Sequence, residues 1–160
     1  MSAVGGEKPV LFRPGYITLE ELEQALGEEV LLSRAILEKL NEGEAAPSPG
    51  MKYKHYAPRA EITLLDGSLE SFQAYVDAHK REDTGALCFT GEEDGLSVPA
   101  VPYGRENDGA NQSRRLFRAL RALDEAGFGT VYARCPRKDG VSMAVYNRLI
   151  RAAAFRVVKL

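Results

Sequence analysis

The sequence predicts an α/β fold, in which an open, mostly parallel, Rossmann-like sheet is flanked by helices and preceded by a linker and a short strand–helix segment. From residue 59 onward, strand and helix patterns alternate, as they do in parallel sheets covered by helices. Ala86–Phe89 is apolar throughout, which is typical of a strand buried on both faces. A stretch that opens with Gly, Ala, Pro and Ser, residues 42–58, separates the segment 1–41 from the alternating region 59–160. We therefore expect three parts with these boundaries.

Apolar runs predict the strands of the alternating region, and leucine-rich stripes predict its helices. The expected strands are Ile62–Leu65, Ala86–Phe89, Ser97–Pro102, Thr130–Ala133 and Phe155–Lys159. The expected helices are Ser68–His79, Asn111–Ala126 and Ser142–Ala154. Two prolines in Ser97–Pro102 indicate an edge strand. Ser68 and Ser142 are expected as helix N-caps, and Gly127 is expected to end the longest helix.

The first part of the chain predicts one strand and two helices. Pro9–Phe12 is the expected strand, and Thr18 with Glu21 forms a capping box before a helix over Leu19–Leu26. Leucine and isoleucine at a spacing of four predict a second helix over Glu28–Asn41. This part is too small to bury a core alone, so we expect it to pack onto the rest or to end another domain.

Composition narrows the class of protein. The chain has 21 basic and 23 acidic residues, and this balance argues against a large nonspecific nucleic-acid surface. Cys88 and Cys135 are far apart and in no CxxC pattern, which suits free thiols in a reducing compartment. There is no run of about 20 apolar residues for a membrane helix and no signal-peptide pattern. We expect a cytoplasmic protein without membrane contact.

Catalytic motifs are scarce. The only histidines are His55 and His79, and His79 is better explained by a packing or boundary role on its helix than by a ligand role. The sequence has no HExxH, Cys/His cluster, GxSxG, Walker A or GxGxxG pattern. No catalytic residue and no metal ligand is therefore predicted, and enzymatic activity of this chain alone stays undecided.

Three groups of side chains remain open to a binding role. Lysine binds phosphates and tyrosine stacks on bases or donates hydrogen bonds, but the linker cluster also fits a solvated segment anchored by its aromatic residues. Arg13 follows a strand in a Pro-Gly turn and is placed for an anion, although a surface salt bridge explains it equally. The stripe Arg114, Arg118 and Arg121 fits a solvated face, or a contact with an acidic partner or RNA. The linker cluster comprises Lys52, Tyr53, Lys54, His55 and Tyr56.

Three strings resemble one family. The eleven residues Ser48–Pro58 (SPGMKYKHYAP) resemble the interdomain linker of the long, two-domain form of threonylcarbamoyl-AMP synthase. Ala144–Leu149 (AVYNRL) with the following Arg151–Ala153 (RAA) resembles the end of the C-terminal domain of that family. Lys8–Gly15 (KPVLFRPG) with its helix resembles the last strand and helix of the YrdC-like catalytic domain. The resemblance covers nearly the whole chain.

The resemblance implies a reaction and a set of partners. The family makes threonylcarbamoyl-AMP from L-threonine, bicarbonate and ATP, with Mg²⁺ accompanying ATP and pyrophosphate released. Its members are nucleotidyltransferases of tRNA modification, and the resemblance also implies binding of double-stranded RNA. The product serves threonylcarbamoyladenosine formation at tRNA position 37 through a downstream transferase. The chain then comprises a remnant of the catalytic domain (1–41), the interdomain linker (42–58) and the C-terminal accessory domain (59–160).

The resemblance also implies site residues. Arg13 touches the phosphates of ATP, and the linker, chiefly Tyr53 with Lys52, Lys54, His55 and Tyr56, closes over the active site as a lid. Lys54 stands where the family usually has arginine, so it keeps the charge but loses the two-pronged contact.

Most of the catalytic domain is missing, so we expect the chain alone to bind no cofactor and to be inactive without its YrdC-like partner. The alternative is a non-catalytic module that binds a small ligand or a protein at the carboxyl ends of its strands.

Overall fold

The computed structural model describes residues 8–36, 38 and 58–160. The region from residue 58 onward forms a five-stranded sheet in the order β5-β4-β6-β3-β7, in which every pair of neighbours is parallel. Its strands are β3 Glu61–Asp66, β4 Thr84–Cys88, β5 Ala100–Pro102, β6 Thr130–Arg134 and β7 Val157–Lys159. The α/β prediction is confirmed, and the proline-containing strand lies at an edge as expected.

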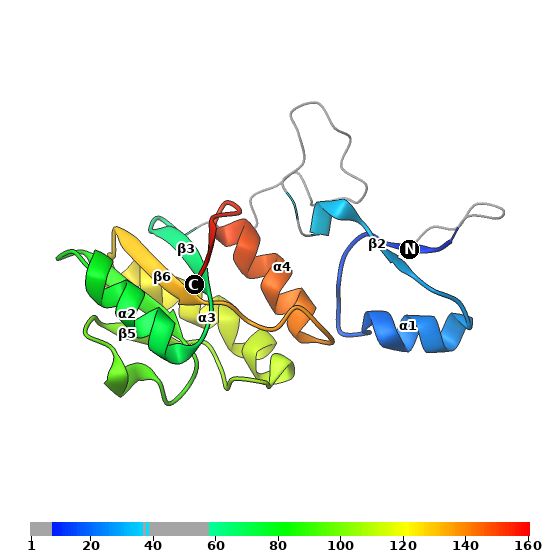
Figure 1. Ribbon diagram of the computed structural model, residues 1–160, viewed down its shortest axis with the longest axis horizontal. Helices are drawn as coiled ribbons and strands as arrows, with labels where there is room; N and C mark the ends of the chain where they lie inside the picture. Colours follow the sequence, from blue (N-terminus) through cyan, green and yellow to red (C-terminus); the bar gives the residue numbers. More distant parts are fainter. Residues whose placement is uncertain (1–7, 37, 39–57) are drawn as a thin grey trace, which may run out of the picture.

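Three α-helices cover the two faces of this sheet (Figure 1): α2 Leu69–His79, α3 Gly109–Ala126 and α4 Ser142–Ala152. Side chains of α3 and α4 share one core with strand residues such as Ile62, Leu64 and Val131. Phe72 and Val76 of α2 pack on the opposite face. The two sets alternate along each strand because successive side chains of a strand point to opposite faces. The result is a three-layer domain with one helix on one side and two on the other.

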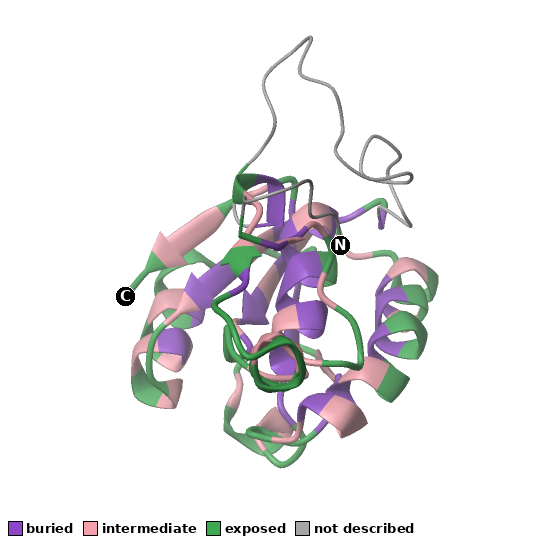
Figure 2. Ribbon diagram, turned by 90° about the vertical axis from the view of Figure 1, so that its right-hand side faces the viewer, coloured by how far each residue is buried: buried purple, intermediate pink, exposed green. Residues whose placement is uncertain are grey.

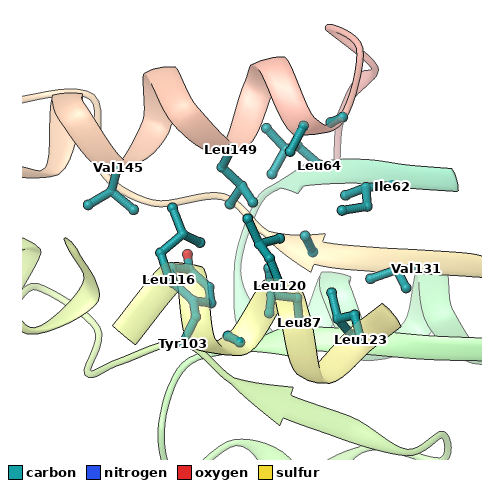
Figure 3. Close-up of a cluster of buried hydrophobic side chains, with 14 of the residues drawn as sticks. Ile62, Leu64, Leu87, Tyr103, Leu116, Leu120, Leu123, Val131, Val145 and Leu149 are labelled. Carbon is teal, nitrogen blue, oxygen red and sulfur yellow. The ribbon is translucent and has the colours of Figure 1, made fainter. Parts of the chain in front are cut away.

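The larger core lies between the sheet and the α3–α4 layer (Figure 3). Leu116, Leu120 and Leu123 of α3 point toward the strands, as the leucine stripe predicted. Leu149 of α4 meets them from the other side. Buried residues concentrate on the strands and on the inward sides of the helices, whereas the outward sides are exposed (Figure 2). The spacing of the apolar residues in the sequence of these helices therefore matches the face that each helix buries.

Two helix starts carry different caps. The Asp108 carboxylate accepts a hydrogen bond from the Asn111 backbone amide at 2.9 Å, so α3 begins two residues before its expected start. The expected N-cap role of Ser142 is wrong, because Val141 is the N-cap of α4 and forms no side-chain cap. Ser142 is instead buried against Gly109 at the start of α3. A Cβ at Gly109 would lie 2.6 Å from the Ser142 nitrogen, so this crossing requires glycine.

The segment 8–36 forms a small unit of its own. Strand β1 Val10–Leu11 pairs in parallel with β2 Leu31–Leu32. Helix α1 Leu19–Leu26 begins with the expected capping box and ends at Gly27. Figure 1 shows this unit beside α4, on the side away from the sheet. One strand pair and one helix leave it little core, as its size predicted.

The expected helix Glu28–Asn41 is wrong over the described residues. Strand β2 and a 3₁₀ turn, η1 Arg34–Ile36, occupy this stretch instead. The Leu31 amide donates to the Pro9 carbonyl at 2.8 Å, and the Ser33 amide donates to Leu11 at 2.9 Å. Strand pairing with β1 satisfies the backbone, and a shared cluster buries the apolar residues, so tertiary contacts override the local spacing.

Candidate functional site

Of the six residues predicted to bind ATP or substrate, the structure describes one, Arg13, and it also describes the stripe Arg114, Arg118 and Arg121, which is exposed on α3. Arg13 lies directly after β1, in a turn that continues through Pro14 and Gly15. It is an exposed residue that forms no side-chain hydrogen bond or ion pair with the part of the chain described here. The surface salt bridge weighed for it is therefore not formed within that part. The linker residues Lys52, Tyr53, Lys54, His55 and Tyr56 lie outside the described residues.

The segment 8–36 is held against α4 by buried contacts. The side-chain amide of Asn147 donates to the carbonyl oxygen of Ile36 at 2.8 Å. The Arg151 guanidinium donates to the carbonyl oxygen of Ala35, also at 2.8 Å. Met143 packs against the apolar cluster of the segment, which includes Ile36. Three residues on one face of α4, spaced four apart, thus fix the position of the segment.

A narrow cleft lies between this segment and the loop that leads into α4. Its volume is about 90 Å³, whereas sites for small ligands usually enclose about 300–1,000 Å³. This volume is too small to enclose ATP, and we call the cleft the seam. The lining residues come from the segment (Leu11, Pro14, Gly15, Ile17, Thr18, Leu19, Glu20, Leu32) and from the loop and α4 (Lys138, Asp139, Gly140, Met143).

The two charged residues on the loop side of the cleft, Lys138 and Asp139, are each paired with another charged side chain. The Lys138 ammonium donates to the Asp66 carboxylate at 2.7 Å and lies over the Tyr146 ring. Burial lowers the pKa of Lys138, but the hydrogen bond to Asp66 and nearby acidic groups outweigh it, so the net shift is upward. Asp139 pairs with Arg137 at 2.6 Å. The Lys138–Asp66 pair therefore ties the loop to the end of β3, whereas the Asp139–Arg137 pair lies within the loop.

Arg13 lies in the turn with Pro14 and Gly15, which line the seam, and its charge acts on Arg151 of α4. Partial burial lowers the pKa of Arg151 and the nearby Arg13 charge lowers it further. Two guanidinium groups within electrostatic range favour an anion near them. The sequence analysis did not identify Arg151 as a binding residue, because the segment Arg151–Ala153 was used only for the family resemblance. Its spacing of four from Asn147, on the same helix face, was the available signal.

A buried arginine lies at the carboxyl ends of the strands. Arg134, at the end of β6, donates from Nε to both carboxylate oxygens of Glu92 at 3.2 Å. Its other nitrogens donate to the Gly67 carbonyl at 2.7 Å and to Glu106 at 3.4 Å. The guanidinium is 5.1 Å from the Phe89 ring centroid. Arg134 thus ties together the loops after β3, β4 and β5, at the edge where the sequence analysis weighed a small-ligand site.

Metal-binding and membrane-spanning features are absent from the described part of the chain. Within residues 8–36, 38 and 58–160, no group of three or more His, Cys, Asp and Glu side chains could hold a metal ion. No helix in these ranges is long and apolar enough to cross a bilayer. Cys88 is buried and Cys135 is half-buried, and both thiols are free. Burial raises the pKa of Cys88 to about 12 and that of Cys135 to about 11, so neither is an activated nucleophile.

Comparison with known proteins gives a consistent relationship. The family model described as "Threonylcarbamoyl-AMP synthase, C-terminal domain" matches residues 17–154. Threonylcarbamoyl-AMP synthase of Pyrococcus abyssi is 32% identical over 161 residues, covering 95% of this chain and 44% of the relative. The enzyme of Bacillus subtilis is 33% identical over 155 residues, covering 94% and 43%. The chain therefore spans less than half the length of these relatives.

Solved structures agree with the sequence matches. The crystal structure of P. abyssi Sua5 complexed with L-threonine superimposes with a TM-score of 0.77 at 30% identity, covering 94% of this chain and 44% of that one. A variant of the same protein with an adjacent histidine and tyrosine changed to alanine gives the same TM-score at 29% identity, covering 94% and 43%. Because the family model spans most of the chain, the protein belongs to the threonylcarbamoyl-AMP synthase C-terminal domain family and corresponds to the C-terminal part of those synthases.

Proposed function

We propose that this chain acts as the C-terminal part of a threonylcarbamoyl-AMP synthase. The reaction joins L-threonine, bicarbonate and ATP to give threonylcarbamoyl-AMP and pyrophosphate, with Mg²⁺ entering bound to ATP. The product then serves threonylcarbamoyladenosine formation at tRNA position 37 through a separate transferase. Family membership supports this proposal, as does the L-threonine complex of P. abyssi Sua5. The free thiols fit a reducing compartment such as the cytoplasm.

The docked segment 8–36 is the observation that carries the proposal. Four of the large apolar side chains on it stay exposed: Tyr16 at 82%, Ile17 at 61%, Leu31 at 42% and Leu26 at 41%. A two-stranded unit with this much uncovered apolar surface needs a further partner. We infer that the YrdC-like catalytic domain covers it. Residues 1–41 then complete that domain, residues 42–58 are the interdomain linker and residues 59–160 are the accessory domain.

Arg13 is the phosphate contact in this proposal. Its turn forms one side of the seam, and its side chain has no competing partner among the residues described. A guanidinium donates two parallel hydrogen bonds to a phosphate and stays charged at any physiological pH. Arg13 would hold the ATP phosphates while the catalytic domain binds the rest of the nucleotide.

The linker is proposed to act as a lid on this site. The described residues on either side of it are attached to the same helical layer: the Ile36 carbonyl accepts from Asn147 of α4, and the Arg59 amide donates to Asp124 of α3 at 2.8 Å. A chain fixed at both ends samples fewer open positions than a free one. Closure over ATP would exclude water from the labile mixed anhydride. Tyr53 with Lys52, Lys54, His55 and Tyr56 would supply the contacts.

A solved variant of a similar protein supports testing one His-Tyr pair of the proposed lid first. The solved P. abyssi variant has an adjacent histidine and tyrosine changed to alanine. The only His-Tyr dipeptide of this chain is His55-Tyr56. This pair is therefore the first place to test the lid.

Pyrophosphate release is the test of the whole proposal. We would measure it with ATP, Mg²⁺, L-threonine and bicarbonate, using the chain alone, a separately produced catalytic domain alone, and both together. We expect no pyrophosphate release by the chain alone, and faster release by the mixture than by the catalytic domain alone. Normal turnover by the chain alone would show that the catalytic domain is not needed. No effect in any mixture would instead favour the alternative of a non-catalytic module that binds a small ligand or a protein.

A further inference from the structure

One face of the α3–α4 layer carries a concentration of arginine. The two helices hold six arginines against two acidic residues, while the chain as a whole has a net charge of −2. Five of these arginines are exposed. We call them, with the exposed Phe117, the arginine face: Arg114, Arg115, Arg118, Arg121, Arg148 and Phe117.

The charge of this face is not neutralised within the protein. Among the described residues, none of its five arginines forms an ion pair, and Arg114 donates only to the backbone carbonyl of Ala110 on its own helix. The guanidinium groups are therefore available to an outside anion. Arg114, Arg118 and Arg121 lie about one helical turn apart on the outward side, about 4.5–6 Å from one to the next along the axis. They form a line of positive charge, as a chain of phosphates requires.

An aromatic ring lies within the arginine face. Phe117 has 47% of its surface exposed, and the Arg148 guanidinium from α4 lies 5.4 Å from its ring centroid. Two large planar groups thus lie in cation–π contact between the two helices. Unpaired bases of RNA stack on aromatic rings and on arginine planes, whereas the bases inside a duplex are not available for this contact.

We propose that the arginine face binds a single-stranded segment of RNA, with its phosphates on the arginines of α3 and an unpaired base on the Phe117–Arg148 pair. Use of arginine throughout, with no lysine, favours a planar, two-pronged contact with phosphate over general attraction. An acidic protein would also match the charge, but it would leave the Phe117–Arg148 pair without a specific partner. This function is independent of the proposed synthase activity, because no residue of the seam takes part in it.

Fluorescence anisotropy with the full chain tests the proposal, using a labelled oligoadenylate of 12 nucleotides, a 12-base-pair RNA duplex and a poly-glutamate peptide. The test variant is Arg114→Gln/Arg118→Gln/Arg121→Gln. Loss of three phosphate contacts should weaken oligoadenylate binding about 100-fold at 0.1 M salt. The slope of log K against log salt should become shallower by about 2. The matched control Lys80→Gln/Arg81→Gln/Lys159→Gln removes the same charge from other exposed positions and should change the affinity less than threefold.

Two variants test the Phe117–Arg148 pair. Phe117→Leu keeps apolar area but loses the ring, and Arg148→Lys keeps the charge but loses the plane. Each should weaken oligoadenylate binding about tenfold with an unchanged salt slope. Preference for the duplex, or equal affinity of the α3 triple variant and its control, would overturn the proposal. Tighter binding of poly-glutamate than of oligoadenylate would likewise overturn it and assign the face to an acidic protein. Thermal melts of each variant verify that folding is retained.

Discussion

The side-chain amide of Asn147 and the carbonyl oxygen of Ile36 are 111 positions apart in the chain and lie 2.8 Å apart in the structure. Both residues are buried. Changing Asn147 to Ala leaves the Ile36 carbonyl buried without this donor, which costs about 1–3 kcal/mol. We expect a drop of that size in the free energy of unfolding, measured by urea denaturation.

Limited proteolysis separates local from global effects of this change. In the Asn147→Ala protein, cleavage within residues 8–36 should precede cleavage within the sheet, because the segment loses its attachment to α4. Arg148→Ala, one position along and exposed, is the control and should stay within about 0.5 kcal/mol of the parent. Equal stability of Asn147→Ala and the parent would show that the segment is held by its apolar cluster alone.

The buried pair Arg134–Glu92 should behave as one unit. The two side chains are 5% and 10% exposed, and removing one partner of such a pair costs about 3–5 kcal/mol because the other charge is left buried. Arg134→Met and Glu92→Leu should each destabilise by about this amount. The double variant should lose much less than the sum. Additive losses in urea denaturation would contradict the coupling.

The Gly109–Ser142 crossing predicts a strict size limit. A methyl group at Gly109 would lie 2.6 Å from both the Ser142 nitrogen and its Oγ, and backbone atoms cannot move away at low cost. We expect Gly109→Ala to lower the melting temperature by several degrees, which corresponds to about 1–3 kcal/mol of overpacking. Gly15→Ala is the matched control, since no atom lies within 4 Å of its added Cβ. Similar melting temperatures for both variants would show that α3 and α4 can separate freely.

The sheet domain was predictable because its local signals agree with its packing. The continuous apolar runs form the strands, and the leucine stripe of α3 faces the core. Both were detectable because burial of one or both faces of an element determines the spacing of its apolar residues in the sequence. The capping box at Thr18 and the stop at Gly127 were also found, because both use local hydrogen bonds and backbone angles. The edge position of β5 followed from its prolines.

The errors share a different cause. Residues 31–36 have helical spacing, but pairing with β1 decides their structure, and each paired residue of β1 lies 21 positions earlier. Ser142 carries a good capping side chain, yet it is buried against Gly109 by the crossing of two helices. The sequence analysis did not single out Arg134, because its partners Glu92 and Glu106 come from other loops. Long-range contacts of this kind leave no local period to detect. The part of the predicted site in the linker stays a prediction.

The raised thiol pKa values predict a loss of stability in alkaline solution. Cys88 and Cys135 keep their protons to about pH 12 and 11 when folded, whereas an unfolded thiol loses its proton near 8.5. Between these values the folded state binds more protons, so stability is complete below about pH 8.5 and falls as pH rises. Each thiol contributes a slope of up to about 1.4 kcal/mol per pH unit.

Urea denaturation at pH 8, 9.5 and 10.5 measures this effect. The variant Cys88→Ala/Cys135→Ala is less stable at pH 8 because it lacks core volume, but it should show the shallower pH dependence. Iodoacetamide labelling of the folded parent at pH 8 should be slow at both positions and fast in urea. Equal pH slopes for the parent and the variant would mean that the thiols titrate normally when folded.

Arg13 gives the sharpest test of the proposed catalytic role, in a protein that joins this chain to its catalytic domain. Arg13→Ala should raise the KM for ATP and lower kcat/KM by about 10- to 150-fold, because a charged group contributes about 1.5–3 kcal/mol per hydrogen bond. Arg13→Lys should recover part of this loss, since it keeps the charge without the two-pronged contact. Stability should not change, because the side chain is exposed and bonded to nothing in the described residues. Lys8→Ala removes another cation of the same segment, one paired with Glu29 at the surface, and should leave the KM unchanged. An unaltered KM in Arg13→Ala would remove Arg13 from the phosphate site and leave the docked segment with a structural role only.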